Sequence, residues 1–199
     1  MAGVPFVGLT GGLGAGKSEA LRALGELGAA TLSTDAVVHE LLADEELRDI
    51  VVERLGSEVA RDGRLDRSLI AERVFGDEES RAWLEGELWP RVGRRVAEWK
   101  QELETLDPAP PAAVVEVPLL FESGMEAAFD ATIAVVADEA VREERAGARG
   151  HAAVAERTGR QLSQAEKSQR ADFEVRNDGT LEELKETLSR VLAKLAPVP

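Results

Sequence analysis

A lysine and a serine stand side by side near the start of the chain, directly after a glycine-rich stretch. Together they complete the pattern G-x-x-x-x-G-K-[ST], with its defined positions at Gly11, Gly16, Lys17 and Ser18. In such a loop the backbone N–H groups wrap a polyphosphate, the lysine contacts the β- and γ-phosphates, and the serine hydroxyl binds Mg²⁺. The motif therefore predicts a site for a nucleoside triphosphate, with Ser18 as metal ligand, built by Gly12, Leu13, Gly14, Ala15, Gly16, Lys17 and Ser18.

The segments on either side of this loop favour that interpretation over a chance glycine-rich turn. An apolar run, Phe6–Leu9, predicts a short buried strand before the loop. The segment Lys17–Leu27 carries apolar residues at helical spacing, and Gly28 suits the end of a helix. A strand, a glycine loop and a helix in this order are the context that a phosphate-binding loop requires.

An acidic residue follows the second predicted strand. Ala29–Leu32 reads as that strand, Asp35 comes soon after it, and a helix is predicted from Ala36. Ligands of open α/β sheets lie beyond the carboxyl ends of the strands. Asp35 therefore suits a catalytic role, in which it accepts the proton of an attacking hydroxyl or holds Mg²⁺ through water. The alternative is that Asp35 only caps the following helix.

The order of the remaining segments predicts an α/β fold. Further apolar strands are expected at Ala112–Val117, Ala131–Val136 and Ala171–Val175, so the chain fits a doubly wound, parallel, five-stranded sheet of the P-loop NTPase type. Residues 1–35 and 112–199 would form this nucleotide-binding core. Residues 36–111 show no strand signal and would form a helical insertion, whose long last helix, Glu78–Leu106, should kink or break at Pro90.

A basic segment at about 138–170 interrupts an otherwise acidic chain. It includes Arg142, Arg145, Arg149, Arg157 and Lys167, with glycines at 147 and 150. Arginines around a glycine-bearing break suggest a lid that closes over the phosphates and supplies charge to the transferred group. The alternative is a solvated helix with ion pairs four residues apart.

Composition narrows the function classes further. The net charge of −14 argues against nucleic acid as the main partner. The chain has no cysteine, which excludes disulfides and thiolate metal sites. We find no signal peptide and no apolar stretch that approaches the length of a membrane span. A cytoplasmic protein is expected, without a membrane partner, as a monomer or small homo-oligomer.

Several segments, spread in order over nearly the whole chain, resemble the dephospho-coenzyme A kinase family. The most specific of them are Pro118-Leu119-Leu120-Phe121-Glu122 and the late Asn177-Asp178-Gly179. The others are Val7–Gly12, Thr34–Ala36, Asp62–Arg67, the Arg157 to Gln161 spacing, and Ala171-Asp172.

The resemblance implies ATP-dependent phosphorylation of the ribose 3′-hydroxyl of dephospho-CoA, with Mg²⁺ as cofactor. Asp35 would be the base, and the lid arginines Arg145 and Arg149 would join Lys17 in catalysis. Arg157, Asn177 and Gly179 would contact ATP. The acceptor would lie against Asp35, Leu119, Phe121, Glu122 and the insertion around Leu65.

Two positions depart from the family pattern. Trp89-Pro90 stands where relatives often have His-Pro, so a polar role there is lost or moved. Glu19 stands where relatives often have a hydroxyl residue, which removes a donor to the α-phosphate.

Rival functions share the phosphate loop. A kinase of nucleosides, nucleoside monophosphates or shikimate shares the lid as well, but Pro118–Glu122 and the long insertion argue against it. A small GTPase-like switch would need an Asn-Lys-x-Asp stretch, and Asn177-Asp178 lacks the lysine. A mechanical ATPase would need a separate partner-binding domain.

Overall fold

A computed structural model describes residues 3–147 and 161–195. The chain divides into two compact units, one made of Met1–Ser33 with Lys100–Pro199 and the other of Thr34–Trp99. The sequence predicts a helical insertion at residues 36–111, and these bounds differ from those of the second unit. Its role in binding the acceptor remains a prediction.

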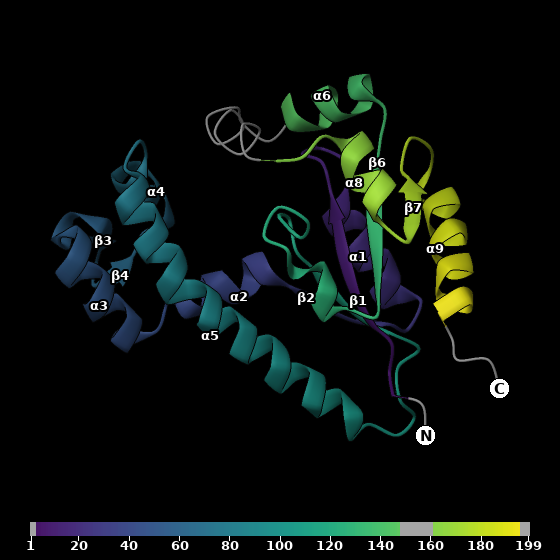
Figure 1. Cartoon of the computed structure of the whole chain (residues 1–199), viewed down its shortest axis with the longest axis horizontal. Coiled ribbons are helices and arrows are strands. Elements are labelled where there is room, and N and C mark those ends of the chain that lie inside the picture. Colours follow the sequence, from purple (N-terminus) through teal and green to yellow (C-terminus); the bar gives the residue numbers. More distant parts are fainter. Residues whose placement is uncertain (1–2, 148–160, 196–199) are drawn as a thin grey trace. The chain divides into compact units, whose positions relative to one another are not determined.

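The first unit is built on a parallel five-stranded sheet, as predicted (Figure 1). Its strands are β1 (Phe6–Gly11), β2 (Ala30–Ser33), β5 (Ala113–Glu116), β6 (Ala131–Val136) and β7 (Phe173–Arg176), in the order β2-β5-β1-β6-β7. In the register, Gly8 of β1 lies opposite Val115 of β5 and Thr132 of β6. The strand that leads into the glycine loop is therefore the central strand.

The two faces of this sheet are covered differently. Residues of α1 (Lys17–Glu26) and α9 (Leu181–Leu195) pack with Val7, Leu9 and Ile133 in one buried apolar cluster. On Gly8 an added Cβ would lie 3.0 Å from Leu120 and 3.1 Å from Phe129. The segment that follows β5 therefore packs directly on the opposite face, where the absence of a side chain leaves room for it.

Among the described residues, three shorter helices also belong to this unit. They are η2 (Met125–Ala128), α6 (Glu139–Gly147) and α8 (Gln164–Arg170). The start of α9 has a capping box, because Thr180 N donates to Glu183 Oε2 at 2.8 Å and Glu183 N donates to Thr180 Oγ1 at 3.3 Å.

The second unit is mainly helical and has its own core. It contains α2 (Thr34–Leu41), α3 (Glu45–Leu55), η1 (Ser57–Val59), α4 (Arg67–Val74) and most of α5 (Glu78–Glu104). Leucine, valine and isoleucine side chains from these elements form a separate buried cluster, which includes Leu47, Val51, Leu55, Ile70 and Leu84.

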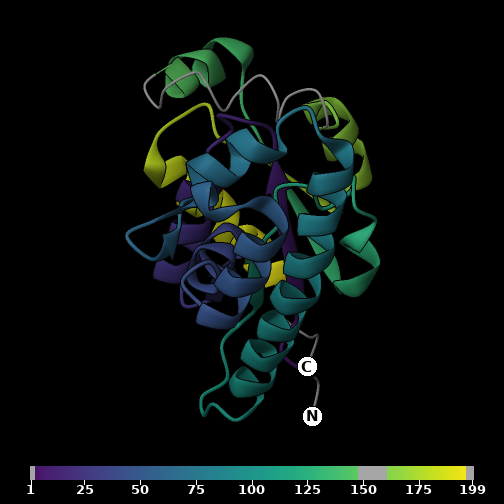
Figure 2. The ribbon, with the colours of Figure 1, turned by 90° about the vertical axis from the view of Figure 1, so that its left-hand side faces the viewer.

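The structure corrects two expectations about this unit. A small hairpin, β3 (Ala60–Arg61) with β4 (Arg64–Leu65), lies where no strand was expected. Asp62 and Gly63, with φ of 52° and 74°, form its turn. The other correction concerns α5, which runs through Pro90 as one helix, so the proline does not break it (Figures 1 and 2).

Within the described residues, none of the helices is both long enough and apolar enough to cross a membrane.

Candidate active site

The glycine loop closes onto the start of α1. Gly14 and Gly16 have φ of 74° and 90°, a region that other residues rarely adopt. Gly16 is the N-cap residue of α1, and its carbonyl accepts from Ala20 N at 2.9 Å. The first N–H groups of α1 thus lie at the carboxyl end of the central strand, where a phosphate would meet the positive end of the helix dipole.

Lys17 and Ser18 occupy the first turn of α1. The Lys17 ammonium donates to the carbonyls of Gly11 and Gly12, each at 3.0 Å, so it lies across the loop. Ser18 is exposed. Its hydroxyl is a hard oxygen donor of the kind that Mg²⁺ prefers, beside the place where phosphate oxygens would complete the coordination. Glu19 also lies in this turn, where its charge complements the helix dipole.

Asn177, directly after β7, is hydrogen-bonded to the glycine loop. Its side-chain Nδ2 donates to Ala15 O at 3.0 Å, and its backbone N donates to Val136 O at 2.8 Å. The Arg145 guanidinium donates to Asn177 O at 2.9 Å. Asn177 is only 2% exposed. Its side-chain amide therefore holds the phosphate loop against the sheet.

Gly179 lies against the carboxylate that caps α9. A Cβ there would lie 2.0 Å from Glu183 Oε2, the oxygen that accepts the hydrogen bond from Thr180 N. The glycine leaves room for the capping box of α9.

Two more segments close around the loop. The Arg142 guanidinium of α6 donates to Leu13 O at 2.9 Å. Gln164 of α8 packs its Cγ so close to Gly12 that a Cβ there would lie 2.8 Å away. The Gln164 amide is itself held by Ala137, to whose O it donates and from whose N it accepts, both at 2.9 Å. Of the described arginines of α6, Arg142 thus bonds to the glycine loop, whereas Arg145 bonds to the Asn177 carbonyl.

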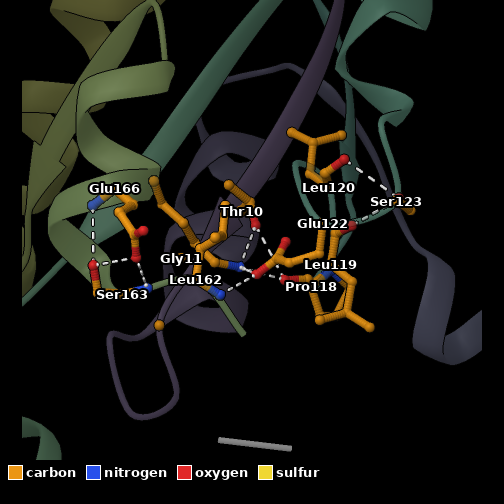
Figure 3. A network of polar contacts seen from close by, with 12 residues as sticks. Thr10, Gly11, Pro118, Leu119, Leu120, Glu122, Ser123, Leu162, Ser163 and Glu166 are labelled. Carbon is orange, nitrogen blue, oxygen red and sulfur yellow. Dashed lines mark hydrogen bonds and ion pairs between the residues drawn. The ribbon is translucent and has the colours of Figure 1, made fainter. Parts of the chain in front are cut away.

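The segment after β5 lies beside the start of the loop (Figure 3). Thr10 Oγ1 donates to Pro118 O at 3.2 Å, and Glu122 Oε1 accepts from Leu162 N at 2.8 Å. The Lys167 ammonium of α8 lies 2.9 Å from the same Glu122 oxygen. Phe121 is 4% exposed and lies under the Arg170 guanidinium, 4.8 Å from the ring centroid, whereas Leu119 is half-buried.

Asp35 and Leu65 belong to the second unit. The helix α2 begins at Thr34, so Asp35 lies inside its first turn, two residues after the cap position. Asp35 Oδ1 lies 3.5 Å from Arg67 Nη2 of α4, and both side chains are nearly half exposed. Leu65 packs against the core of this unit. Arg149 and Arg157 lie outside the described residues.

Sequence reasoning did not assign individual roles to Lys167, Gln164 and Arg142. Arg142 and Lys167 were noted only as members of a basic segment. A lysine with no exposed surface gives no distinct signal in a single sequence, because its partners are set by the fold. Asp172 is similar, since its carboxylate accepts from Thr132 N at 2.8 Å and so ties β7 to β6.

The sequence matches known proteins over most of its length. A family model described as dephospho-CoA kinase matches residues 5–183. The chain belongs to the dephospho-CoA kinase family. Among curated relatives, the dephospho-CoA kinase of Protochlamydia amoebophila is 39% identical over 193 residues, 95% of both chains. That of Chlamydia abortus is 37% identical over 183 residues, 90% of both chains.

Solved structures agree in fold. A crystal structure from Thermus thermophilus matches with a TM-score of 0.82 and 34% identity, covering 98% of this chain and 100% of the other. The dephospho-CoA kinase from Campylobacter jejuni matches with a TM-score of 0.65 and 22% identity, covering 99% and 100%. As a member of this family, the chain is a kinase that phosphorylates dephospho-CoA with ATP.

Proposed function

We propose that this kinase transfers the γ-phosphoryl group of ATP to the ribose 3′-hydroxyl of dephospho-CoA, giving CoA and ADP. The observation that carries the proposal is the loop Gly12–Ser18 at the N-terminus of α1, in a chain of this family. Phosphoryl transfer depends mainly on positioning and on neutralising charge at the transferred group. Lys17 supplies a cation at the loop, and its side chain would turn from the Gly11 and Gly12 carbonyls to the phosphates.

Ser18 would hold Mg²⁺ together with the phosphate oxygens of ATP. Bound Mg²⁺ supplies positive charge at the β- and γ-phosphates. The exposed Ser18 hydroxyl fits this ion, which usually binds one or two protein oxygens, substrate phosphates and water.

The remaining residues would serve the two substrates. Asp35 would accept or orient the proton of the 3′-hydroxyl. Arg145, Arg149 and Arg157 would face the phosphates. The turn at Asn177 and Gly179 would border adenine, and Asn177 would act there mainly by holding the loop through Ala15.

Leu119, Phe121, Glu122, Asp35 and Leu65 would serve the acceptor. We also expect the kinase to act in the cytoplasm as a monomer or small homo-oligomer, without nucleic acid or membrane.

An acceptor panel with an ADP-release assay tests the proposal. Dephospho-CoA should release ADP with Mg²⁺ present, whereas AMP, adenosine and shikimate should not. The 3′-deoxy analogue of dephospho-CoA should bind but not turn over, and the product should match CoA by mass and chromatography. Turnover of the 3′-deoxy analogue would overturn the position of transfer, and a preference for AMP would overturn the acceptor.

A further inference from the structure

The Lys167 ammonium has no exposed surface, yet it carries a charge into the core of the first unit. Three oxygens surround it. The Pro118 carbonyl lies at 2.7 Å, Glu122 Oε1 at 2.9 Å and Thr10 Oγ1 at 3.4 Å. An ammonium has three N–H donors, so this arrangement gives each donor an acceptor.

The three oxygens belong to segments that are far apart in the sequence. Thr10 lies in β1, directly before Gly11, where the phosphate loop begins. Pro118 follows the neighbouring strand β5 and begins the segment that we assign to the acceptor side. The Thr10 hydroxyl donates to the same Pro118 carbonyl at 3.2 Å. One buried cation therefore joins the start of the ATP loop to the start of the acceptor segment.

Glu122 is turned toward the protein as well (Figure 3). Its side chain is 11% exposed, and Oε1 accepts from both Lys167 Nζ and Leu162 N. Its second oxygen, Oε2, is buried and has no hydrogen-bond partner among the described residues. The carboxylate therefore has one oxygen bonded to protein groups and the other buried. Its charge serves to hold Lys167 and the backbone at Leu162.

The start of α8 is held by contacts that do not involve Lys167. Ser163 and Glu166 form a capping box there, in which Ser163 N donates to Glu166 Oε2 at 2.8 Å. The hydrogen bonds that Ser163 donates from its hydroxyl and its backbone keep the pKa of Glu166 below its usual value. Lys167 thus projects from a helix whose first turn is anchored by its own contacts.

From these contacts we propose that Lys167, paired with Glu122, is a positioning residue for phosphoryl transfer. It acts through Thr10 and Pro118, by keeping the phosphate loop and the segment 118–122 in fixed relation. Misplacement of reacting groups by about 1 Å costs on the order of 100-fold in rate. The inference rests on the proposed function for the assignment of 118–122 to the acceptor side.

Two variants separate positioning from stability. Lys167→Met leaves the buried Glu122 carboxylate without its cation, so we expect a clear fall in melting temperature. In Lys167→Met/Glu122→Gln both charges are gone, and we expect most of the melting temperature to return. We expect kcat, at saturating ATP and dephospho-CoA, to stay about 30-fold or more below that of the unmodified enzyme in both variants. The Kd for ATP, measured by calorimetry, should change by less than about threefold.

Lys185→Met is the matched control. Lys185 also makes an ion pair at 2.9 Å in the first unit, with Glu26, but it joins α9 to α1 away from the loop. Its kcat should stay within about twofold of the unmodified enzyme, since the contacts of Lys167 remain.

One result would overturn the inference: recovery of kcat together with melting temperature in the double variant, which would leave the pair a structural role alone. If Lys167→Met does not fold, the double variant decides the question. A failure of the proposed function looks different, because the unmodified enzyme would then not phosphorylate dephospho-CoA.

Discussion

The side-chain amide of Asn177 donates to the Ala15 carbonyl at 3.0 Å and thereby joins the end of the last strand to the middle of the phosphate loop. Ala15 itself has no exposed surface. The carbonyl is thus held by a protein donor where water does not reach. This bond makes the shape of the loop depend on a residue near the opposite end of the chain.

Replacing Asn177 with alanine should weaken ATP binding. The buried Ala15 carbonyl would lose its partner, which costs about 1–3 kcal/mol, and the loop would relax. We expect KM for ATP to rise about tenfold, the equivalent of 1.4 kcal/mol, with a smaller change in KM for dephospho-CoA. Steady-state kinetics with each substrate varied in turn measures this. Thr180→Ala, which removes a nearby helix cap, should leave KM for ATP unchanged. An equal rise in both KM values in Asn177→Ala would contradict the role in the loop.

Alanine variants of two glycines allow the effect of backbone strain to be measured apart from that of a steric clash in the loop. Gly16 and Gly28 have φ of 90° and 94°. A Cβ on Gly16 would lie 2.1 Å from Asn177 Nδ2, whereas a Cβ on Gly28 would have nothing within 4 Å. Both alanine variants should lose about 1–2 kcal/mol of folding free energy from strain. Only Gly16→Ala should also lose ATP binding in calorimetry, and normal binding by that variant would show that the loop tolerates the displacement of Asn177.

Asp35 is expected to act on the acceptor hydroxyl, and Arg67 to orient it. Asp35→Asn should lower kcat by about 100-fold or more with an unchanged Kd for ATP, because the amide cannot take the proton. Arg67→Ala removes the partner at 3.5 Å and should lower kcat less, by about tenfold, with partial rescue in Arg67→Lys. Since both side chains are nearly half exposed, the pair should contribute less than about 1 kcal/mol to stability. A normal kcat in Asp35→Asn would leave Asp35 without a catalytic role.

Asp77 gives a prediction for the dependence of stability on pH. It accepts hydrogen bonds from Ser80 N at 3.0 Å and Ser80 Oγ at 2.7 Å, in the first turn of α5. These bonds lower the pKa of Asp77 in the folded protein, and the bond from the Ser80 backbone has the larger effect. A lowered folded-state pKa means that the stabilisation is present above pH about 4, the ordinary pKa of an aspartate, and is lost as pH falls through the lowered value.

Thermal unfolding of the unmodified protein and Asp77→Ala at a series of pH values measures this. The variant should melt lower near pH 7, and the difference should shrink as the solution becomes more acidic. Glu53→Ala, an exposed acid on α3, serves as the control and should show no such trend. A difference for Asp77→Ala that is independent of pH would rule out the ionised carboxylate as its source.

Much of the sheet could be predicted because local pattern and chemistry agree there. The strand Ala131–Val136 was predicted with its observed bounds, and the helix from Lys17 follows directly from the glycine loop. The hairpin at Ala60–Leu65 was missed because its strands have two residues each, too few for alternation to appear. The turn residues Asp62-Gly63 were its only local signal.

The internal contacts of the site were harder to predict. The resemblance names Glu122 and Asn177 as ligand contacts, which stays a prediction, and in the structure both side chains also bond to protein groups. A motif fixes which residues occur together in a family. It does not distinguish a residue that touches a ligand from one that holds its neighbour, because that depends on three-dimensional partners such as Lys167 and Ala15.

The chain passes between the two units at two places, and the structure there affects where proteases cleave it. The strand β2 ends at Ser33 and α2 begins at Thr34, while α5 continues across Trp99 and Lys100. Neither crossing therefore contains a loop, and proteases cleave most readily at exposed loop tips. Limited proteolysis should nick turns inside each unit, such as Asp62-Gly63, before it releases residues 34–99 as an intact fragment.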